Sequence, residues 1–353
     1  MTALLDIIRA QIRATGPMTV ADYMALCLGH PKHGYYTTRD PLGAAGDFTT
    51  APEISQMFGE MIGLWLARVW ADAGRPAPFR LVELGPGRGT CMADALRAAR
   101  AAPGFVAAAD LWLVETSPTL RAAQAERLPG AQWAKRLEEV PQGPCLVVAN
   151  EFLDALPMRQ FIASAEGWRE KLVGLGPEGL AWGLSPALPG GSEAPEGAWR
   201  EESALASAIA GQIAARIGGE GGAALIVDYG YRAADRAAGF TLQALRGHAP
   251  ADPLDAPGQA DLTWLIDFDR LAAGLAPLAT ACAPQGAFLA RLGIGQRAAQ
   301  LAAARPGEAE AIAEALERLT AGDRMGTLFK ALAAWPAGQR PPPGFDRGFE
   351  ETA

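Results

Sequence analysis

A glycine-rich junction between an apolar run and a helical segment is the feature that most constrains the fold. The stretch "RLVELGPGRGTCMADALRAA", residues 80–99, passes from apolar residues through Gly85, Gly87 and Gly89 into a segment expected to be a helix. Glycines at such a junction let the backbone approach a bound ligand closely. The spacing is G-x-G-x-G, which differs from the G-x-G-x-x-G of dinucleotide sites. The junction therefore predicts a ligand-binding loop at the end of a strand.

Short apolar runs alternate with helical segments from residue 79 onward. Strands are expected within residues 80–84, 110–117, 131–134, 143–152 and 221–231, with an edge strand within 325–335. This alternation is typical of a parallel sheet with crossover helices. The apolar run at 145–149 suits a strand buried on both faces. The chain is therefore expected to have an α/β fold.

The segments around this pattern differ from it in composition and in expected secondary structure. Residues 1–75 are predicted to be helical, apart from an irregular segment at 30–55 that is rich in Gly, Pro, Thr and Asp. Such long irregular segments are rare in compact domains unless they are functional or disordered. Residues 158–187 read as short strands joined by glycine-containing turns, which indicates an antiparallel insert.

Composition argues against several classes of function. The chain of 353 residues carries a net charge of -8, which argues against nonspecific nucleic-acid binding. No apolar run reaches the roughly 20 residues that would cross a bilayer, so no membrane insertion is expected. The 4 cysteines are widely spaced and there are only 3 histidines, which argues for a reducing compartment and against a bound metal. We expect a cytoplasmic protein that is a monomer or a small homo-oligomer.

Two acidic residues distinguish between the possible ligands of the loop. Glu83 lies two residues before it, where a carboxylate is unsuited to a pyrophosphate. Glu115 ends the next apolar run, where it could accept hydrogen bonds from a ribose diol. S-adenosylmethionine has a ribose diol, an ammonium and a carboxylate but no phosphate, so the pattern V-E-L-G-x-G-x-G favours it and resembles motif I of class I methyltransferases. On the loop alone, a dinucleotide, or a tight turn with incidental acids, stays open.

Polar residues also follow the apolar run at 145–149. Asn150, Glu151 and Asp154 lie where class I methyltransferases place residues that face the substrate. Methyl transfer is an in-line displacement from a sulfonium, so the enzyme mainly positions the nucleophile and shapes the charge around it. A guanidinium nucleophile would suit carboxylates, which pair with it bidentately. The alternative is that Asn150 caps the next turn and Glu151 is merely solvated.

The ordered set of motifs resembles that of the MidA family. The matching segments are "GDFTTAPEISQMFGEMIG" (46–63), "VELGPGRGT" (82–90), "ANEFLDALPMRQF" (149–161), "IVDYGY" (226–231) and "TLQALRGHAPADPLDAPGQADLTWLIDF" (241–268). The resemblance extends from about residue 15 to 335, and it implies a class I S-adenosylmethionine-dependent methyltransferase. This fold has a Rossmann-like, mostly parallel seven-stranded sheet. The implied activity is methylation of an arginine in a subunit of the respiratory NADH dehydrogenase, complex I, in support of its assembly.

The resemblance also implies a domain organisation. Residues 1–353 would form a single methyltransferase domain. Residues 1–78 would be an N-terminal helical extension with a lid loop, 79–157 and 221–340 the cofactor-binding α/β core, and 158–220 an α+β insert.

Site residues carried over by position form three groups. Glu83, Gly85, Gly87 and Gly89 would line the methionine end of S-adenosylmethionine, Glu115 would bind its ribose, and Asn150 and Glu151 would face the transferred methyl group. Asp47, Phe48, Thr49, Thr50 and Glu53 belong to a loop that would fold over the cofactor. His248 and Asp261 could complete the substrate wall, although Asp261 could equally cap a helix that begins there.

On the acceptor side, the resemblance leaves two candidates for a second carboxylate. No double-glutamate hairpin of the better-known arginine methyltransferases is visible, so Glu151 would act with Glu53 or Asp154. A small residue and a histidine are expected where Trp264 and Leu265 stand, which bears on activity and specificity. The alternatives are small-molecule O- or N-methylation, an assembly chaperone that retains a cofactor site, and an NAD-linked oxidoreductase.

Overall fold

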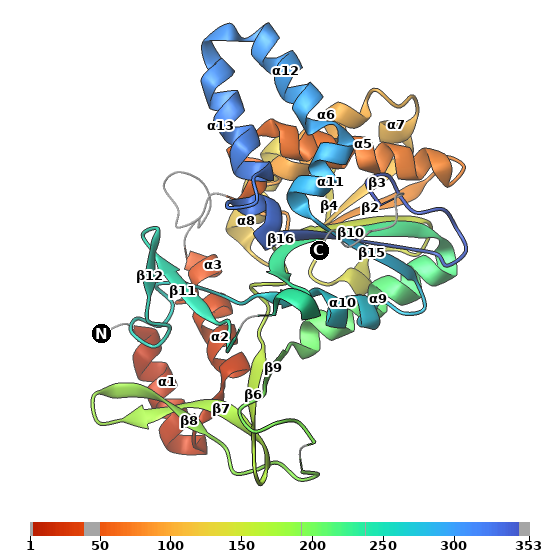
Figure 1. Cartoon of the computed structure of the whole chain (residues 1–353). Helices are drawn as coiled ribbons and strands as arrows, with labels where there is room; N and C mark the ends of the chain where they lie inside the picture. The colour runs from red at the N-terminus through yellow and green to blue at the C-terminus, as the bar shows by residue number, and fades with distance from the viewer. Residues whose placement is uncertain (1–2, 39–49, 192, 237, 346–353) are drawn as a thin grey trace. The chain divides into compact units, whose positions relative to one another are not determined.

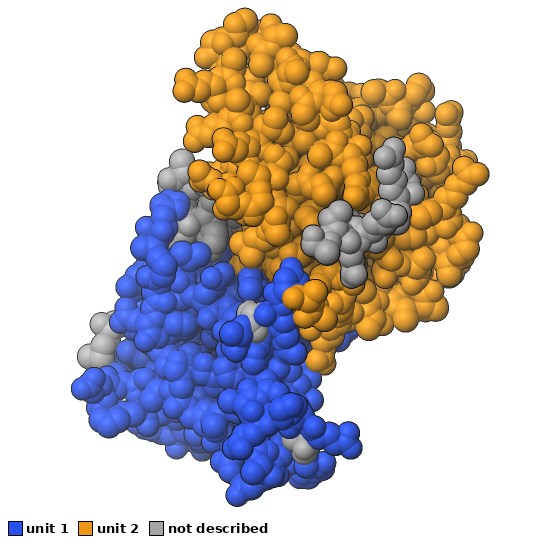
Figure 2. Space-filling model, viewed as in Figure 1, with its two compact units in different colours: residues 1–48, 154–208, 235–265 blue, residues 49–153, 209–234, 266–353 orange. Residues whose placement is uncertain are grey.

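The chain folds into two compact units, each built from segments that are separate in the sequence. In the computed structural model, which describes residues 3–38, 50–191, 193–236 and 238–345, unit 1 comprises 1–48, 154–208 and 235–265 (Figure 2). Unit 2 comprises 49–153, 209–234 and 266–353. Asp47, Phe48 and Thr49 lie outside the described residues. The boundaries expected for the extension, core and insert stay a prediction.

Unit 2 contains the central sheet. Its strands run in the order β15–β16–β10–β5–β2–β3–β4 (Figure 1). Their bounds are β2 Phe79–Leu84, β3 Ala109–Val114, β4 Gln132–Ala134, β5 Cys145–Asn150, β10 Gly222–Tyr231, β15 Ala279–Pro284 and β16 Phe329–Trp335. The pairs from β10 to β4 are parallel, β16 is antiparallel to both neighbours, and short β14 (Ile266–Asp267) pairs with β10 in parallel. The predicted α/β fold with a mostly parallel sheet is confirmed.

The strand predicted at the sheet edge is in fact internal. β16 pairs with β10 on one side and β15 on the other, and all seven of its residues are buried. The prediction was wrong because β15 has the sequence "ATACAP", which lacks the large apolar residues that mark a strand. Because β15 was not predicted, only one strand was expected beside β16.

One face of this sheet packs against α5 (Gln56–Asp72), α6 (Thr90–Ala99) and α11 (Gln285–Leu292) in a single hydrophobic core. Helices α5 and α6 approach closely because α5 carries two glycines on the contact face. A Cβ at Gly63 would lie only 2.2 Å from the Ala95 carbonyl oxygen. Helices α12 (Ile294–Ala304) and α13 (Ala309–Thr320) form a hairpin that projects from this unit (Figure 1).

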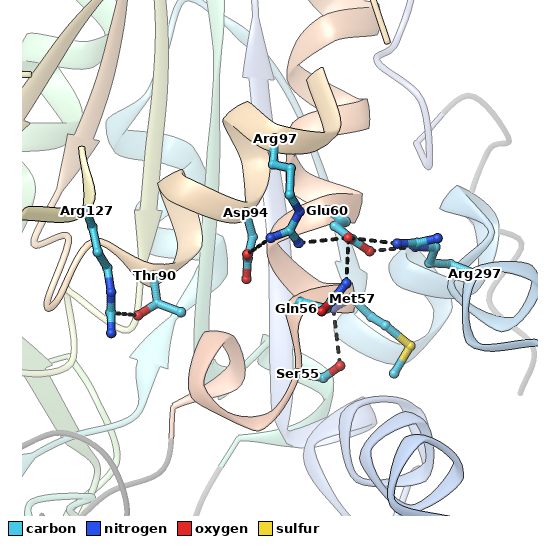
Figure 3. Close-up of polar contacts among 9 residues, drawn as sticks. All are labelled: Ser55, Gln56, Met57, Glu60, Thr90, Asp94, Arg97, Arg127 and Arg297. Atoms are coloured by element: carbon cyan, nitrogen blue, oxygen red, sulfur yellow. Dashed lines mark hydrogen bonds and ion pairs between the residues drawn. The ribbon is translucent and has the colours of Figure 1, made fainter. Parts of the chain in front are cut away.

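A charged cluster fixes α5 against two other helices. The buried Glu60 carboxylate of α5 accepts hydrogen bonds from Arg97 of α6 at 2.8 Å and from Arg297 of α12 at 2.7 and 2.9 Å (Figure 3). Burial raises the pKa of Glu60, but the hydrogen bonds from Arg297 and Arg97 outweigh it and hold the pKa below its ordinary value. The cluster therefore ties α5 both to α6, the helix that follows the glycine loop, and to α12.

Unit 1 consists of two antiparallel sheets with helices α1 (Ala3–Thr15), α2 (Val20–Gly29) and α3 (Tyr35–Thr38). The larger sheet contains β1 (Met18–Thr19), β6 (Arg159–Ser164), β7 (Gly167–Gly176), β8 (Gly179–Leu184) and β9 (Trp199–Glu202). The smaller contains β11 (Gln243–Arg246), β12 (Ala249–Ala251) and β13 (Asp261–Thr263). The antiparallel strands expected within 158–187 are present as β6, β7 and β8. None of the helices in the described residues is long and apolar enough to cross a membrane.

Candidate active site

The predicted cofactor residues gather at the carboxyl ends of three adjacent strands in unit 2. The strand order β5–β2–β3 places the residues that follow Asn150, Leu84 and Val114 side by side. Carboxyl ends of parallel strands form the binding edge of open α/β sheets. The fold of unit 2 therefore brings together the glycine loop, Glu115 and the polar residues Asn150 and Glu151.

The glycine loop needs glycine for both conformation and space. Gly85, Gly87 and Gly89 all have positive φ, at 62°, 54° and 78°. At Gly85 a Cβ would also lie 2.5 Å from Cδ2 of Phe152, which leaves no room for a side chain. Gly89 is the N-cap of α6, so the helix begins directly after the loop. The loop can thus present backbone to a ligand without side chains in between.

Glu83 is a buried carboxyl group within the central strand β2. Its residue is 2 % exposed, and it pairs in register with Leu113 of β3 and Val148 of β5. Within the described residues, Oε2 has no hydrogen-bond partner. Burial raises the pKa of Glu83 to about 8, against the opposing effect of a hydrogen bond with the Cys91 side chain. A buried acceptor without a partner is costly and is typical of a site that a ligand completes.

Glu115 follows β3 and is held by the start of the next helix, α8 (Pro118–Arg127). Its Oε1 accepts hydrogen bonds of 2.7 Å from both the Thr116 and Ser117 backbone N–H groups. Burial raises the pKa of Glu115 above its ordinary value, although these two N–H groups oppose the shift. Because one oxygen is fixed by backbone, the orientation of the carboxylate is set before any ligand binds.

Asn150 and Glu151 contact each other where β5 ends. Asn150 Nδ2 donates to Glu151 Oε1 at 3.2 Å, while its buried Oδ1 has no partner in the part of the chain that the structure describes. Glu151 has φ of 49°, a left-handed conformation that non-glycine residues rarely adopt. Such strain recurs at functional sites, where the surrounding structure maintains it.

Helix α4 (Ala51–Ile54) adds a second carboxylate to this region. The Ala51 N–H donates to Glu151 Oε1 at 2.8 Å. Glu53 Oε1 accepts a hydrogen bond from Thr90 Oγ1 at 2.6 Å, and its Oε2 lies 3.9 Å from Arg88 Nη1. Thr50 is the N-cap of α4. The contacts of α4 therefore hold Ala51 at the Glu151 carboxylate and Glu53 at Thr90, the first residue of α6.

Two further predicted residues belong to unit 1. Asp154 is buried, and its backbone carbonyl accepts a hydrogen bond of 3.2 Å from the Trp264 N–H. His248 is exposed in the turn between β11 and β12, with φ of 61°. Their proposed contacts with substrate stay predictions.

The structure around Asp261 and Trp264 differs from one interpretation of the sequence. Asp261 does not cap a helix: it begins strand β13, and both of its carboxylate oxygens accept hydrogen bonds from Tyr36 Oη, at 3.0 and 2.9 Å. Trp264 is buried in unit 1, and its indole N–H donates to the Leu156 carbonyl oxygen at 3.0 Å. The residue that departs from the expected motif is therefore a packed part of the fold.

Several residues near the glycine loop were not identified from the sequence. Arg88 and Thr90 contact Glu53, and Gln124 of α8 contacts both the loop and Glu115. The first two stand inside the recognised motif, so their position could have suggested a role. Gln124 lies 35 residues beyond Gly89 in an ordinary helical segment, and no local pattern marks it.

The donor and acceptor chemistry of the site fits S-adenosylmethionine. Glu83 lies in the strand that leads into the loop and Glu115 follows the neighbouring strand, and their carboxyl groups suit the amine and hydroxyl donors of this cofactor. The described residues contain no cluster of three or more His, Cys, Asp or Glu side chains that could hold a metal ion.

Comparisons with known proteins agree with this chemistry. Residues 61–283 match the model of a family described as S-adenosyl-L-methionine-dependent methyltransferase. Protein arginine methyltransferase NDUFAF7 of Danio rerio is 39% identical, over 84% of this chain and 78% of the relative. The NDUFAF7 homolog of Drosophila melanogaster is 39% identical over 93% of this chain and 84% of the relative. A crystal structure from Burkholderia thailandensis with bound S-adenosyl-homocysteine superposes with a TM-score of 0.85 at 28% identity, covering 98% of this chain and 95% of that one.

These relatives correct one expectation and establish the family. Both NDUFAF7 relatives are named as mitochondrial proteins, which contradicts the cytoplasmic location inferred from the sequence. The cofactor and the class of reaction agree with the expectation, since the family model and the S-adenosyl-homocysteine complex both concern methyl transfer from S-adenosylmethionine. The chain belongs to this family of S-adenosyl-L-methionine-dependent methyltransferases.

Proposed function

We propose that this methyltransferase acts on the guanidinium group of an arginine in a protein. The curated relatives named above are protein arginine methyltransferases. The observation that carries the proposal is that helix α4 connects two acids: the Glu151 carboxylate, which follows β5, accepts a hydrogen bond from Ala51, and Glu53 lies two residues further along α4. Carboxylates match the fork of donors on a guanidinium, which favours arginine over a neutral hydroxyl acceptor.

Each group of residues has its own task in this proposal. S-adenosylmethionine supplies an electrophilic methyl group on a sulfonium. The glycine loop and Glu83 hold the methionine end of the cofactor, and Glu115 holds the ribose through the oxygen that the backbone leaves available. Asn150 and Glu151 orient the guanidinium so that one nitrogen faces the methyl group, which is the main requirement of an in-line displacement.

The target follows from the resemblance to the MidA family. We propose a subunit of the respiratory NADH dehydrogenase, complex I, as the protein that carries the arginine. The relatives support a protein substrate, and a negative net charge of -8 is compatible with a basic target segment.

The test is methyl transfer from isotopically labelled S-adenosylmethionine to complex I purified from a strain that lacks this methyltransferase. We expect label on arginine, identified by mass spectrometry, and a rate about 100-fold lower for Glu151→Gln at saturating cofactor. Glu126→Gln is the control, because Glu126 is exposed on α8. Label on another residue type, or an unchanged rate for Glu151→Gln, would contradict the proposal.

A further inference from the structure

Gln124 connects two parts of the cofactor site that are separate in the sequence. Its side chain lies on α8 and is fully buried, at 0 % exposure. The amide Nε2 donates to the Gly87 carbonyl oxygen at 2.6 Å and lies 3.5 Å from Glu115 Oε2. One amide group therefore contacts the glycine loop and the carboxylate that ends β3.

A third contact determines which way the amide points. The indole N–H of Trp133, in strand β4, donates to Gln124 Oε1 at 2.8 Å. An indole N–H can only donate, so it requires the amide oxygen on its side. The NH2 group must then face Gly87 and Glu115, both of which offer acceptors.

A second side chain of α8 reinforces the same connection. Arg127 lies three residues after Gln124, hence on the same face of the helix. It donates to Thr90 Oγ1 (Figure 3) and, at 3.4 Å, to the Arg88 carbonyl oxygen. At the other end of α8, Arg121 Nε donates to the Glu115 carbonyl oxygen at 2.8 Å. Helix α8 thus contacts Glu115 and the glycine loop along one face.

We propose that Gln124 is a positioning residue that sets the Glu115 carboxylate and the glycine loop at the relative distance that S-adenosylmethionine requires. It acts through Gly87 and Glu115 and does not itself need to contact the acceptor. The inference rests on the cofactor roles proposed for these two residues, and it is independent of which acceptor receives the methyl group.

Cofactor binding measured by calorimetry separates this inference from the proposed acceptor. For Gln124→Leu we expect the affinities for S-adenosylmethionine and S-adenosylhomocysteine to fall about tenfold or more, since a partly buried carbonyl and a buried carboxylate each lose a donor. At saturating cofactor, kcat should stay within about threefold of the unmodified protein, so the loss appears in KM. Failure of arginine methylation alone would leave these binding results unchanged.

The matched control is another buried glutamine outside the site. Gln285 is also 0 % exposed, and its Nε2 donates to the Leu319 carbonyl oxygen at 2.9 Å. Gln285→Leu should lower the melting temperature without a selective loss of cofactor affinity. Equal losses of affinity in both variants would assign Gln124 a merely structural role and overturn the inference.

Two further variants test the route by which Gln124 acts. Trp133→Phe removes the donor that orients the amide, so it should weaken cofactor binding about threefold even if Gln124→Leu does not fold. In a double-mutant cycle, Glu115→Ala and Gln124→Leu should weaken binding by less than the product of the two single effects. Unchanged affinity in Trp133→Phe, or fully independent effects in the cycle, would contradict the proposal.

Discussion

Replacing Glu83 by glutamine should stabilise the protein much more at pH 8 than at pH 5. Burial raises the pKa of this carboxyl group to about 8 in the folded state. In the unfolded chain its pKa returns to about 4.3. Between these values the folded state holds a proton that the unfolded state has lost, so the free energy of unfolding falls as pH rises.

The size of this effect follows from the two pKa values. From pH 5 to pH 8, ionisation of Glu83 alone should lower the free energy of unfolding by about 3.5 kcal/mol. The adjacent Cys91 does not share the titration in this range, because burial raises its thiol pKa well above the ordinary value. Glutamine has nearly the same shape as glutamate and carries no charge, so Glu83→Gln removes the titration with little change in packing.

Urea unfolding at pH 5, 6.5 and 8, followed by tryptophan fluorescence, measures the effect. The difference between Glu83→Gln and the unmodified protein should grow with pH, whereas the exposed control Glu126→Gln should show no such trend. S-adenosylmethionine should reduce the difference at pH 8, because its positive charge favours the ionised carboxylate. A difference that is the same at all three pH values would refute the argument that Glu83 is protonated in the folded protein near neutrality.

Three other substitutions test the structure around the site. Gly85→Ala should weaken S-adenosylmethionine binding in calorimetry, because its Cβ would lie 2.5 Å from the Phe152 ring, whereas Gly74→Ala, with a similar φ and open space, should not. Glu60→Ala should lower the free energy of unfolding in urea by about 2–3 kcal/mol, less than for a fully buried pair because its arginine partners are partly exposed. Ser117→Ala should lower the free energy of unfolding, measured in urea, by about 1 kcal/mol because α8 loses its N-cap.

The strands that carry the cofactor loop could be predicted because their signals are local. A run such as "CLVVA" is apolar along its whole length, and β5, which contains it, is buried on both faces. The positions of Gly85 and Glu115 at the ends of β2 and β3 could be predicted because each directly follows an apolar run, whereas their roles toward the cofactor stay a prediction. β15 could not, since its small residues resemble a helix or a loop as much as a strand.

The contacts that could not be predicted join segments that lie far apart in the sequence. Gln124 follows Gly87 by 37 residues, and only the packing of α8 beside the loop brings them together. The Ala51–Glu151 hydrogen bond joins residues 100 positions apart. Neither pairing leaves a periodicity or a motif in the chain, so neither could be anticipated from local pattern.

The choice between Glu53 and Asp154 as the partner of Glu151 illustrates this limit. Both stand near recognised motifs, and their residue types are equally suited to a guanidinium. The hydrogen bond from Ala51 to Glu151 favours Glu53, because it holds α4 within the same compact unit as the end of β5. Thr90 then fixes the Glu53 carboxylate at the first residue after the glycine loop, the loop that we propose binds the cofactor. The contacts of α4 with Glu151 and with Thr90 thus lie entirely within unit 2, whereas Asp154 belongs to unit 1.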